Sequence, residues 1–474
     1  MNSSAVSPGR AGLLLLLTGQ MLPLIDTSIT NVALDSITHS LDASATQLEL
    51  IVALYGVAFA VCLAMGSKLG DNYGRRRLFL WGVAVFGIAS LLCGMANSIN
   101  ALLAARTLQG AGAALIVPQI LATLHVTLKG TAHARAISLY GGIGGIAFIV
   151  GQMGGGWLVS ADIAGLGWRN AFFINVPICL LVLAFSRRYV PETRRESHSS
   201  IDWQGTFSLA LILCCLLFPM ALGPELHWPW ELQLLLLAVL PLLGWMRLSA
   251  LRKQQRGEQP LLPPRLLKLT SIRFGMAIAL LFFSAWSGFM FCMALTMQAG
   301  LGMAPWQSGN SFIALGVAYF ISALYAPKLI ARYSMGRILL IGLAVQISGL
   351  LLSATFYQLG LRTTTLALVP STALVGYGQA LIVNSFYRIG MRDIRACDAG
   401  AGSAILSTLQ QATLGLGPAI LGSLFLTLAQ RGGGDYAQAL IVFLLVEVAM
   451  MLLLGAIALW LRHHLNLQPA ATAS

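Results

Sequence analysis

Apolar stretches of about the length of a membrane span recur along the whole chain. A transmembrane helix needs about 20 mostly apolar residues, and fourteen windows of the sequence meet this condition. The windows are 11–34, 48–68, 78–97, 101–124, 136–158, 171–189, 205–223, 230–248, 274–295, 308–328, 338–357, 364–387, 400–428 and 437–460. The pattern predicts an all-α polytopic membrane protein with fourteen transmembrane helices.

The composition agrees with lipid as the main solvent. Only 9% of the 474 residues are charged and 57% are hydrophobic, whereas about a quarter of the residues of a soluble protein are charged. Too few charges are present to cover a water-facing surface of this size. A soluble globular protein is therefore excluded.

Several functional classes lack support in the sequence. No Gly-Lys dipeptide occurs, so the chain has no Walker A motif, and we expect no ATP-driven transport by this chain alone. The seven cysteines form no Cys-x-x-Cys pair, and no Cys/His cluster has zinc spacing. No catalytic triad candidate appears. We expect neither an enzyme nor a metal site nor a cofactor.

The basic residues follow the alternation expected of a membrane protein. The chain has 29 Lys and Arg residues and a net charge of +13. With the N-terminus in the cytoplasm, 25 of them fall on the inner side and three on the outer side, and Arg106 lies within a span. Cytoplasmic loops are enriched in Lys and Arg. The distribution predicts cytoplasmic N- and C-termini, and it argues against a nucleic-acid partner.

Asp26 is the sharpest candidate for function, because it stands inside the first predicted span. At about 1.5 Å per residue it lies about 12 Å below the outer end of its helix. An ionised carboxylate at that depth is costly unless it is paired or faces a water-filled cavity. Asp26 is therefore a plausible proton carrier. A permanently protonated or structurally paired aspartate is the alternative.

Arg106 is the one basic residue of a predicted span that does not lie at the inner end of that span, and its depth is similar to that of Asp26. An arginine that cannot deprotonate favours the ionised form of a neighbouring acid. We expect Asp26 and Arg106 to be coupled directly or through water, and Gln109, one turn away, could join them. The alternative is an arginine that extends to the outer interface.

The first inner loop, residues 66–78, combines glycines, one acid and several cations. Its spacing resembles the loop between spans two and three of the major facilitator superfamily. The residues that carry this resemblance are Gly66, Asp71, Gly74, Arg75 and Arg76. A solvated basic turn is the alternative.

The resemblance implies that this loop is a cytoplasmic gate. Asp71 would dock on the start of a helix near Gly400, whose dipole favours an anion, and on a cation such as Arg135.

Further segments resemble the fourteen-span drug:proton antiporters of the same superfamily. Residues 24–35 are similar to their L-D-x-T motif in span one, and 106–114 are similar to the superfamily's R-x-x-Q-G motif in span four. Residues 141–158 resemble the antiporter motif that ends G-P-x-x-G-G. The matching positions of that motif are Gly151, Gln152, Gly155 and Gly156.

The antiporter motif implies export, but Gln152 stands where proline is usual. The expected determinant of a kink is therefore missing. The alternative is a helix interface of small residues with no meaning for transport direction.

The resemblance implies a fold of two six-helix bundles around a central cavity, with two additional spans. The N-terminal bundle would comprise 1–200, the inserted spans 201–250, a cytoplasmic connector 251–273 and the C-terminal bundle 274–474. Polar and aromatic side chains of the spans are candidates for the substrate cavity. They are Asn31, Tyr55, Gln109, Trp286, Asn310 and Tyr319.

Two sets of intramembrane residues have competing interpretations. The aromatics of span nine (Phe282, Trp286, Phe289) could line the cavity, or they could pack or face lipid. For Glu447, in the last span, a structural pair or a dimer contact is a better interpretation than proton transfer. Some relatives that move divalent cations carry further acids in span two. This chain has Ala53 and Tyr55 there, and neither residue is acidic.

The function implied is proton-coupled export of hydrophobic or cationic small molecules by alternating access. The partners would be the substrate, protons and the lipid bilayer, and the chain would act as a monomer in a bacterial inner membrane. A transporter of a specific metabolite or siderophore would share every motif. A non-transporting sensor or scaffold is less favoured, because it would have no use for two charged side chains, Asp26 and Arg106, whose burial in the membrane costs free energy.

Overall fold

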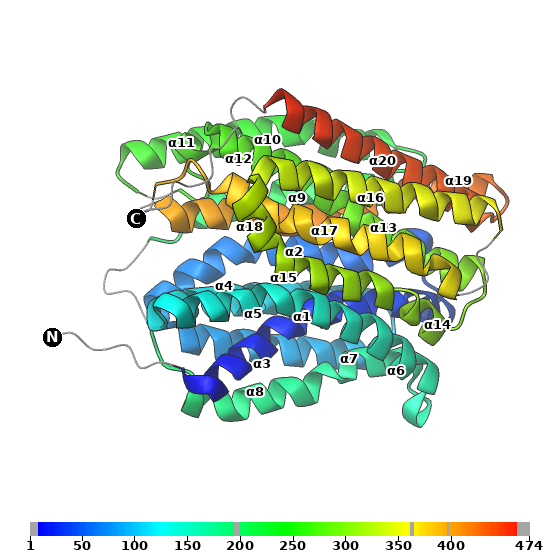
Figure 1. Ribbon diagram of the computed structural model, residues 1–474, viewed down its shortest axis with the longest axis horizontal. Helices are drawn as coiled ribbons and strands as arrows, with labels where there is room; N and C mark the ends of the chain where they lie inside the picture. The colour runs from blue at the N-terminus through cyan, green and yellow to red at the C-terminus, as the bar shows by residue number, and fades with distance from the viewer. Residues whose placement is uncertain (1–7, 194–199, 259, 361–364, 396–397, 462–474) are drawn as a thin grey trace.

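The protein is a bundle of long helices. The computed structural model describes residues 8–193, 200–258, 260–360, 365–395 and 398–461. Within these ranges fourteen helical segments are long and apolar enough to cross a membrane, and they run along one common direction (Figure 1). The predicted all-α fold with fourteen spans is confirmed.

The membrane segments follow one another without large insertions. The first four are α1 (Gly9–Leu41), α2 (Ala45–Tyr73), α3 (Arg75–Met95) and α4 (Ile99–Thr127). The next four are α5 (Gly130–Ile149) with η1 (Val150–Gly154) and α6 (Gly155–Ala161), then α7 (Asn170–Phe173) with α8 (Asn175–Tyr189), then α9 (Trp203–Leu222) and α10 (Trp230–Gln255). The last six are α12 (Thr270–Ile278) with η4 (Ala279–Phe283), α13 (Ser284–Leu295) and η5 (Thr296–Gly300), then α14 (Pro305–Asn310) with α15 (Ile313–Tyr333), α16 (Met335–Gln358), α17 (Val369–Gly390), α18 (Ala399–Gly417) with η8 (Pro418–Gly422) and α19 (Ser423–Arg431), and α20 (Tyr436–Trp460).

The even number of spans brings the start of α1 and the end of α20 to the same side of the bundle (Figure 1). We call this the terminal side. The opposite side, where α1 ends and α2 begins, is the far side. Ser44 starts α2 there with a capping box, in which the Ser44 hydroxyl and the Gln47 side chain each bind a backbone N–H.

Gly74 alone joins α2 to α3 on the terminal side. Its φ of 108° is open to glycine but strained for other residues. A Cβ atom at this position would also lie 2.7 Å from Glu192 Oε1. The sharp reversal therefore depends on glycine for both its backbone conformation and its lack of a side chain.

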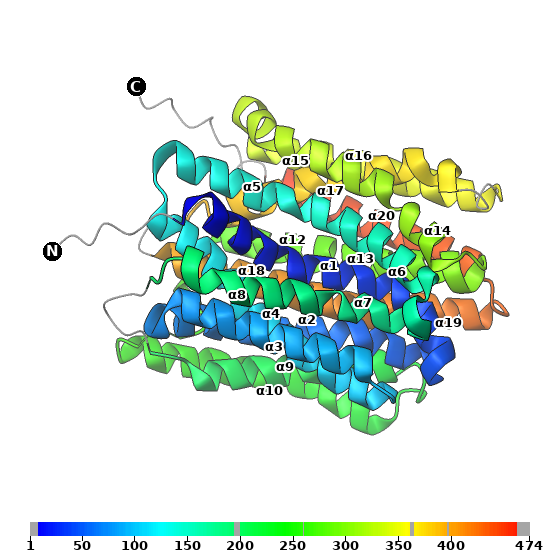
Figure 2. The same cartoon turned by 90° about the horizontal axis from the view of Figure 1, so that it is seen from below.

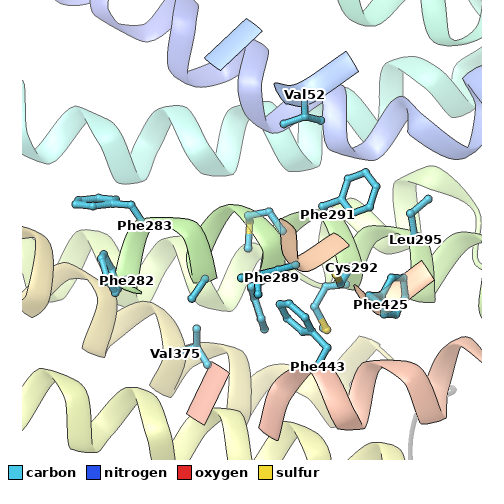
Figure 3. Close-up of a cluster of buried hydrophobic side chains, with 14 of the residues drawn as sticks. Val52, Phe282, Phe283, Phe289, Phe291, Cys292, Leu295, Val375, Phe425 and Phe443 are labelled. Carbon is cyan, nitrogen blue, oxygen red and sulfur yellow. The ribbon is translucent and has the colours of Figure 1, made fainter. Parts of the chain in front are cut away.

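Separate apolar clusters hold the helices together. In the first half, Phe79 and Phe86 of α3 pack with Ile116 of α4, all fully buried. A larger cluster surrounds α13, where Phe289 and Cys292 face Phe443 of α20 (Figure 3). This cluster extends to Val52 of α2 and so connects the two halves.

The helices α9 and α10 lie together along one edge of the bundle (Figure 2). α9 contacts α2 of the first half and η8 and α18 of the second. α10 packs mainly on α9, and only 11% of its most apolar window is buried within the protein. These two helices are inserted between the halves in sequence but are peripheral in space.

π-helical turns interrupt three of the membrane segments, at η1, η4 with η5, and η8. Such turns widen a helix locally and often occur at functional sites. η1 contains Gln152, the position at which the antiporter motif usually has proline. A π-helical turn thus distorts this helix without the proline.

Candidate functional site

The charged centre of the molecule is an ion pair between α1 and α4. Asp26 and Arg106 are both 0% exposed, and Arg106 Nη1 lies 2.5 Å from Asp26 Oδ2. Burying two charges costs several kcal/mol per ion unless their geometry and their other hydrogen bonds compensate. The neighbouring residues supply those hydrogen bonds.

Both carboxylate oxygens of Asp26 are occupied. Oδ1 accepts hydrogen bonds from Gln109 Nε2 at 2.6 Å and from Asn175 Nδ2 at 2.9 Å. Gln109 also accepts from Arg106 Nη1 at 2.5 Å and donates to Ser90 Oγ at 2.9 Å. Four helices, α1, α3, α4 and α8, therefore contribute one side chain or more to a single buried network.

The guanidinium of Arg106 is held from further directions. Its Nε donates to the carbonyl of Ile51 in α2 at 3.1 Å. Its Cζ lies 4.3 Å from the centre of the Tyr55 ring, a cation–π distance. Since α2 supplies both contacts, any movement of α2 relative to α4 acts directly on the charged network.

A cavity of about 220 Å³ lies beside this network, between the two halves. Four of the predicted cavity residues line it: Asn31, Tyr55, Trp286 and Tyr319. Because Tyr55 lines the cavity and also covers Arg106, its ring separates the cavity from the ion pair. Asp26 itself does not line the cavity.

Two predicted cavity residues are placed elsewhere, which corrects the prediction. Gln109 is 0% exposed, and its amide is hydrogen-bonded to Asp26 rather than placed at the cavity wall. Asn310 lies at the end of α14, and its buried Oδ1 has no hydrogen-bond partner among the described residues. Of the three span-nine aromatics, Trp286 lines the cavity, whereas Phe282 and Phe289 are in the core.

The cavity wall is mainly apolar and carries no charged side chain among the described residues. Gln20, Gln410 and Gln411 contribute amides, and none of the lining residues among those described is Asp, Glu, Lys or Arg. Trp286 and Tyr319 have ring centres 5.9 Å apart. Such a wall suits a flat or apolar molecule that makes a few hydrogen bonds.

The antiporter-motif glycines lie where helices approach one another closely. A Cβ atom on Gly151 would lie 2.6 Å from Ser28 Cβ, and one on Gly156 would lie 2.5 Å from the carbonyl oxygen of Pro305 in the second half. The rings of Trp157 and Trp306, one from each half, are 5.6 Å apart. The two halves are therefore closed against each other on the far side.

The loop predicted to be a gate is ordered by its own residues, by the end of α8 and by the segment after α8. Arg75 donates to Asp71 Oδ1 from Nη2 at 2.6 Å, and Arg76 Nη1 donates to the carbonyls of Arg187 and Val190, each at 3.2 Å. Gly66 accepts at its carbonyl from the buried amide of Gln119.

Asp71 does not pair with the expected cation. It pairs with Arg75, one turn later, while Arg135 is exposed. The local pair forms because Arg75 follows directly after the one-residue turn at Gly74. A helix does begin near Gly400, since α18 starts at Ala399, and the docking of Asp71 on it stays a prediction.

Sequence reasoning missed three polar residues of the interior. Asn175 and Ser90 bind the Asp26 network, and only the position of Asn175 within an Ile-Asn-Val-Pro segment could have suggested a role. Glu49 stands at the second residue of a predicted span and was not singled out by its position. It is 2% exposed.

Glu447 has a neutral partner. It is 0% exposed, and its Oε1 accepts from Gln346 Nε2 of α16 at 3.2 Å. The structural pairing favoured by the sequence is present. Among the described residues, no group of three or more His, Cys, Asp or Glu side chains could hold a metal ion.

Comparison with known proteins gives consistent matches. The sequence model of the Major Facilitator Superfamily matches residues 16–418. The chain is 32% identical to a probable actinorhodin transporter of Streptomyces coelicolor over 88% of this chain and 72% of that protein. It is 30% identical to the multidrug resistance protein Stp of Mycobacterium tuberculosis over 85% of this chain and 74% of that protein.

Another relative carries export in its name. The tetracenomycin C resistance and export protein of Streptomyces glaucescens is 30% identical over 87% of this chain and 75% of its own. Among solved structures, a POT family transporter in complex with a thioalcohol-conjugated peptide aligns with a TM-score of 0.69 at 12% identity, over 98% of this chain and 99% of that one. At that identity the likeness concerns the fold alone.

Proposed function

Because this chain belongs to the Major Facilitator Superfamily and is a transporter rather than an enzyme, we propose that it exports hydrophobic or cationic small molecules in exchange for protons. The two halves would rock around the cavity and expose it to one side of the membrane at a time. A single chain supplies both walls of the cavity, so the monomer would suffice.

The observation that carries the proposal is the buried Asp26–Arg106 pair behind Tyr55. A proton that reaches Asp26 neutralises one charge of a pair that otherwise has no net charge, and so it frees Arg106 from its strongest partner. Arg106 also holds α2 through the carbonyl of Ile51. Protonation of Asp26 is therefore suited to alter the contact between α4 and α2, beside the cavity.

The membrane supplies the energy. One elementary charge that crosses the bilayer yields about 2.3 kcal/mol per 100 mV. The positive-inside pattern supports cytoplasmic termini, so that the terminal side would face the cytoplasm and the far side the exterior. A bacterial inner membrane agrees with the sources of the relatives. Several of these are named for resistance or export, which favours outward transport of the substrate.

The test is transport by the purified protein in proteoliposomes with an imposed pH gradient. Wild-type protein should release protons from the acidic lumen when a substrate is added, whereas Asp26→Asn should show no substrate-driven proton flux. Asp42→Asn is a matched control, because Asp42 is exposed and has a left-handed conformation that asparagine tolerates. Full coupled transport by Asp26→Asn would contradict the proposal.

The range of substrates distinguishes the remaining alternative. A panel of hydrophobic cations, neutral aromatic antibiotics and iron chelators should give proton flux with several chemical classes. A response to one compound alone would indicate a transporter for a specific metabolite or siderophore. No flux with any compound, from protein shown to be folded, would favour a non-transporting role.

A further inference from the structure

A second buried acid, Glu49, lies apart from the Asp26 network, where the two halves and the inserted helices meet. It belongs to the second turn of α2, on the far side, and is 2% exposed. Its Cγ would lie 3.8 Å from a Cβ atom on Gly422, beside the Phe291 ring. Figure 3 shows Phe291 on the side of α13 that faces the helix carrying Val52. The carboxyl group is therefore enclosed by both halves.

No cation balances this carboxyl group among the described residues. Oε2 has no hydrogen-bond partner, and the ionisable groups that face Glu49 are Cys292 of α13 and Glu225 of the segment after α9. Arg106, on the neighbouring α4, is held by Asp26 and by the Ile51 carbonyl. An isolated ionised carboxylate in such a place is costly.

Among the described residues, the polar side chain next to Glu49 is that of Ser423 in α19, and its hydroxyl has a competing partner. Glu49 is hydrogen-bonded to the hydroxyl of Ser423. That hydroxyl donates its one hydrogen to the carbonyl of Met220 at 3.0 Å. Because Ser423 has one hydrogen, it cannot donate to the Met220 carbonyl and to an ionised Glu49 at the same time. A proton on Glu49 would let the acid donate to Ser423 while the bond from Ser423 to Met220 remains.

The end of α9 strengthens this preference. The carbonyls of Met220 and Ala221 in its last turn bind the hydroxyls of Ser423 and Thr46, the latter at 3.2 Å. The C-terminus of a helix carries negative partial charge. Negative charge from this end, together with Glu225, disfavours a second negative charge on Glu49.

Contact between the two halves shields Glu49 from water. Near the middle of the membrane, a Cβ atom on Gly56 of α2 would lie only 2.4 Å from Gly415 Cα of α18. Further toward the far side, α2 contacts η8 and α19. If the halves part there, Glu49 leaves Ser423 and meets water, in which the ionised form is no longer disfavoured.

We propose that Glu49 is a second proton-binding site, which must hold a proton for the two halves to close on the far side. The proton comes from water on that side when the halves approach and returns to it when they separate. Protonation of Glu49 thus favours the closed state and ionisation favours the open state. This equilibrium exists without substrate, so it can be tested whichever compound is exported.

The test measures the far-side distance between the halves as a function of pH. Spin labels at Asn97→Cys and Gln430→Cys, both exposed and one in each half, would report the distance in full-length protein in nanodiscs, with the seven native cysteines replaced. In the otherwise unchanged protein the closed-to-open ratio should fall with rising pH, by up to about tenfold per pH unit for one linked proton. Glu49→Gln, which imitates the protonated acid, should stay closed throughout.

Glu447→Gln is the matched control, because it neutralises a buried glutamate whose partner Gln346 lies in the same half. It should retain the pH dependence of the unchanged protein. Glu49→Gln with an unaltered pH dependence would refute the proposal, whether or not Asp26 proves to be the coupling residue. If Glu49→Gln does not fold, infrared spectra of Glu447→Gln with ¹³C-labelled glutamate should show a protonated carboxyl band at neutral pH, and its absence would equally refute the proposal.

Discussion

The two halves of the transporter bury acids in different ways. In the first half, Asp26 is bound to an arginine, a glutamine and an asparagine, so a complete ion pair persists in a dry interior. In the second half, Glu447 is equally buried but binds one neutral amide, that of Gln346. The same architecture thus provides one site built around charge and another without a cation. If proton binding drives transport as proposed, the difference predicts that its largest mechanical effect is in the first half.

Removal of Arg106 should have the largest effect. Arg106→Met would leave the Asp26 carboxylate buried without its cation, at a cost of about 3–5 kcal/mol when one partner of a buried pair is lost. Thermal unfolding in detergent should show a large loss of stability, and coupled transport should cease. The double variant Asp26→Asn/Arg106→Met should recover much of the stability but not the transport. If the single variant were as stable as wild type, the ion pair would not have the role described.

The wall between the cavity and the ion pair gives the second prediction. Tyr55→Ala would remove the ring that covers Arg106, so that water could reach the charged network from the cavity. Proteoliposomes should then lose an imposed pH gradient severalfold faster in the absence of substrate, as read by an enclosed pH-sensitive dye. Tyr55→Phe keeps the ring and should leak no faster than wild type. Equal leakage by Tyr55→Ala and Tyr55→Phe would argue against a separating role.

Asp202, at the start of α9, extends the comparison to an acid outside the membrane spans. Burial alone would raise the pKa of Asp202, but hydrogen bonds from Lys253 and from the N–H groups of Gly205 and Leu261 outweigh burial and hold the pKa below its usual range. The lowered pKa stabilises the fold above about pH 4, the value for an unfolded aspartate, and this contribution disappears as the pH falls through the folded-state pKa.

Replacement of Asp202 should therefore have a pH-dependent cost. Asp202→Asn should lower the free energy of unfolding by about 1.5–3 kcal/mol at pH 7, the usual value of a hydrogen bond to a charged group. The two proteins should converge below about pH 4. Thermal unfolding from pH 7 to pH 3 is the measurement. A difference that does not change with pH would show that the pair with Lys253 adds nothing.

The smallest effect is expected at Glu447. Glu447→Gln replaces a carboxyl group by an amide of the same size beside Gln346, and the free energy of unfolding should change by less than about 1 kcal/mol. Substrate-driven proton flux should be unchanged. Loss of flux in this variant would place a coupling site in the second half and remove the contrast between the halves.

The sequence was sufficient for the features that depend on runs of residues. Fourteen apolar windows became fourteen spans, and Asp26 and Arg106 were conspicuous because ionised side chains are rare inside such windows. Their direct contact could not be read from the sequence, since it depends on how α1 and α4 pack. The part of Asn175 was hidden for the same reason, because it reaches Asp26 from a helix 149 residues away.

Other features could not be predicted because the position of a single residue in the sequence fits more than one structural role. Glu49 stands near the start of its span, and the sequence does not reveal that α13, α19 and the segment after α9 enclose it. As a polar residue of a span, Gln109 could line the cavity or, one turn from Arg106, join the charged pair, and in the structure it joins the pair. Gln152 suggested a straight helix without proline, whereas a π-helical turn forms there in its place.

The last turn of α9 has a consequence for the membrane around the protein. Its carbonyls bind one hydroxyl from each half, Thr46 in α2 and Ser423 in α19. When the halves separate, α9 can follow only one of them, and it takes α10 with it. A helix with so little of its surface enclosed by protein must then push lipid aside. The thickness and stiffness of the bilayer would therefore set part of the work of each transport cycle.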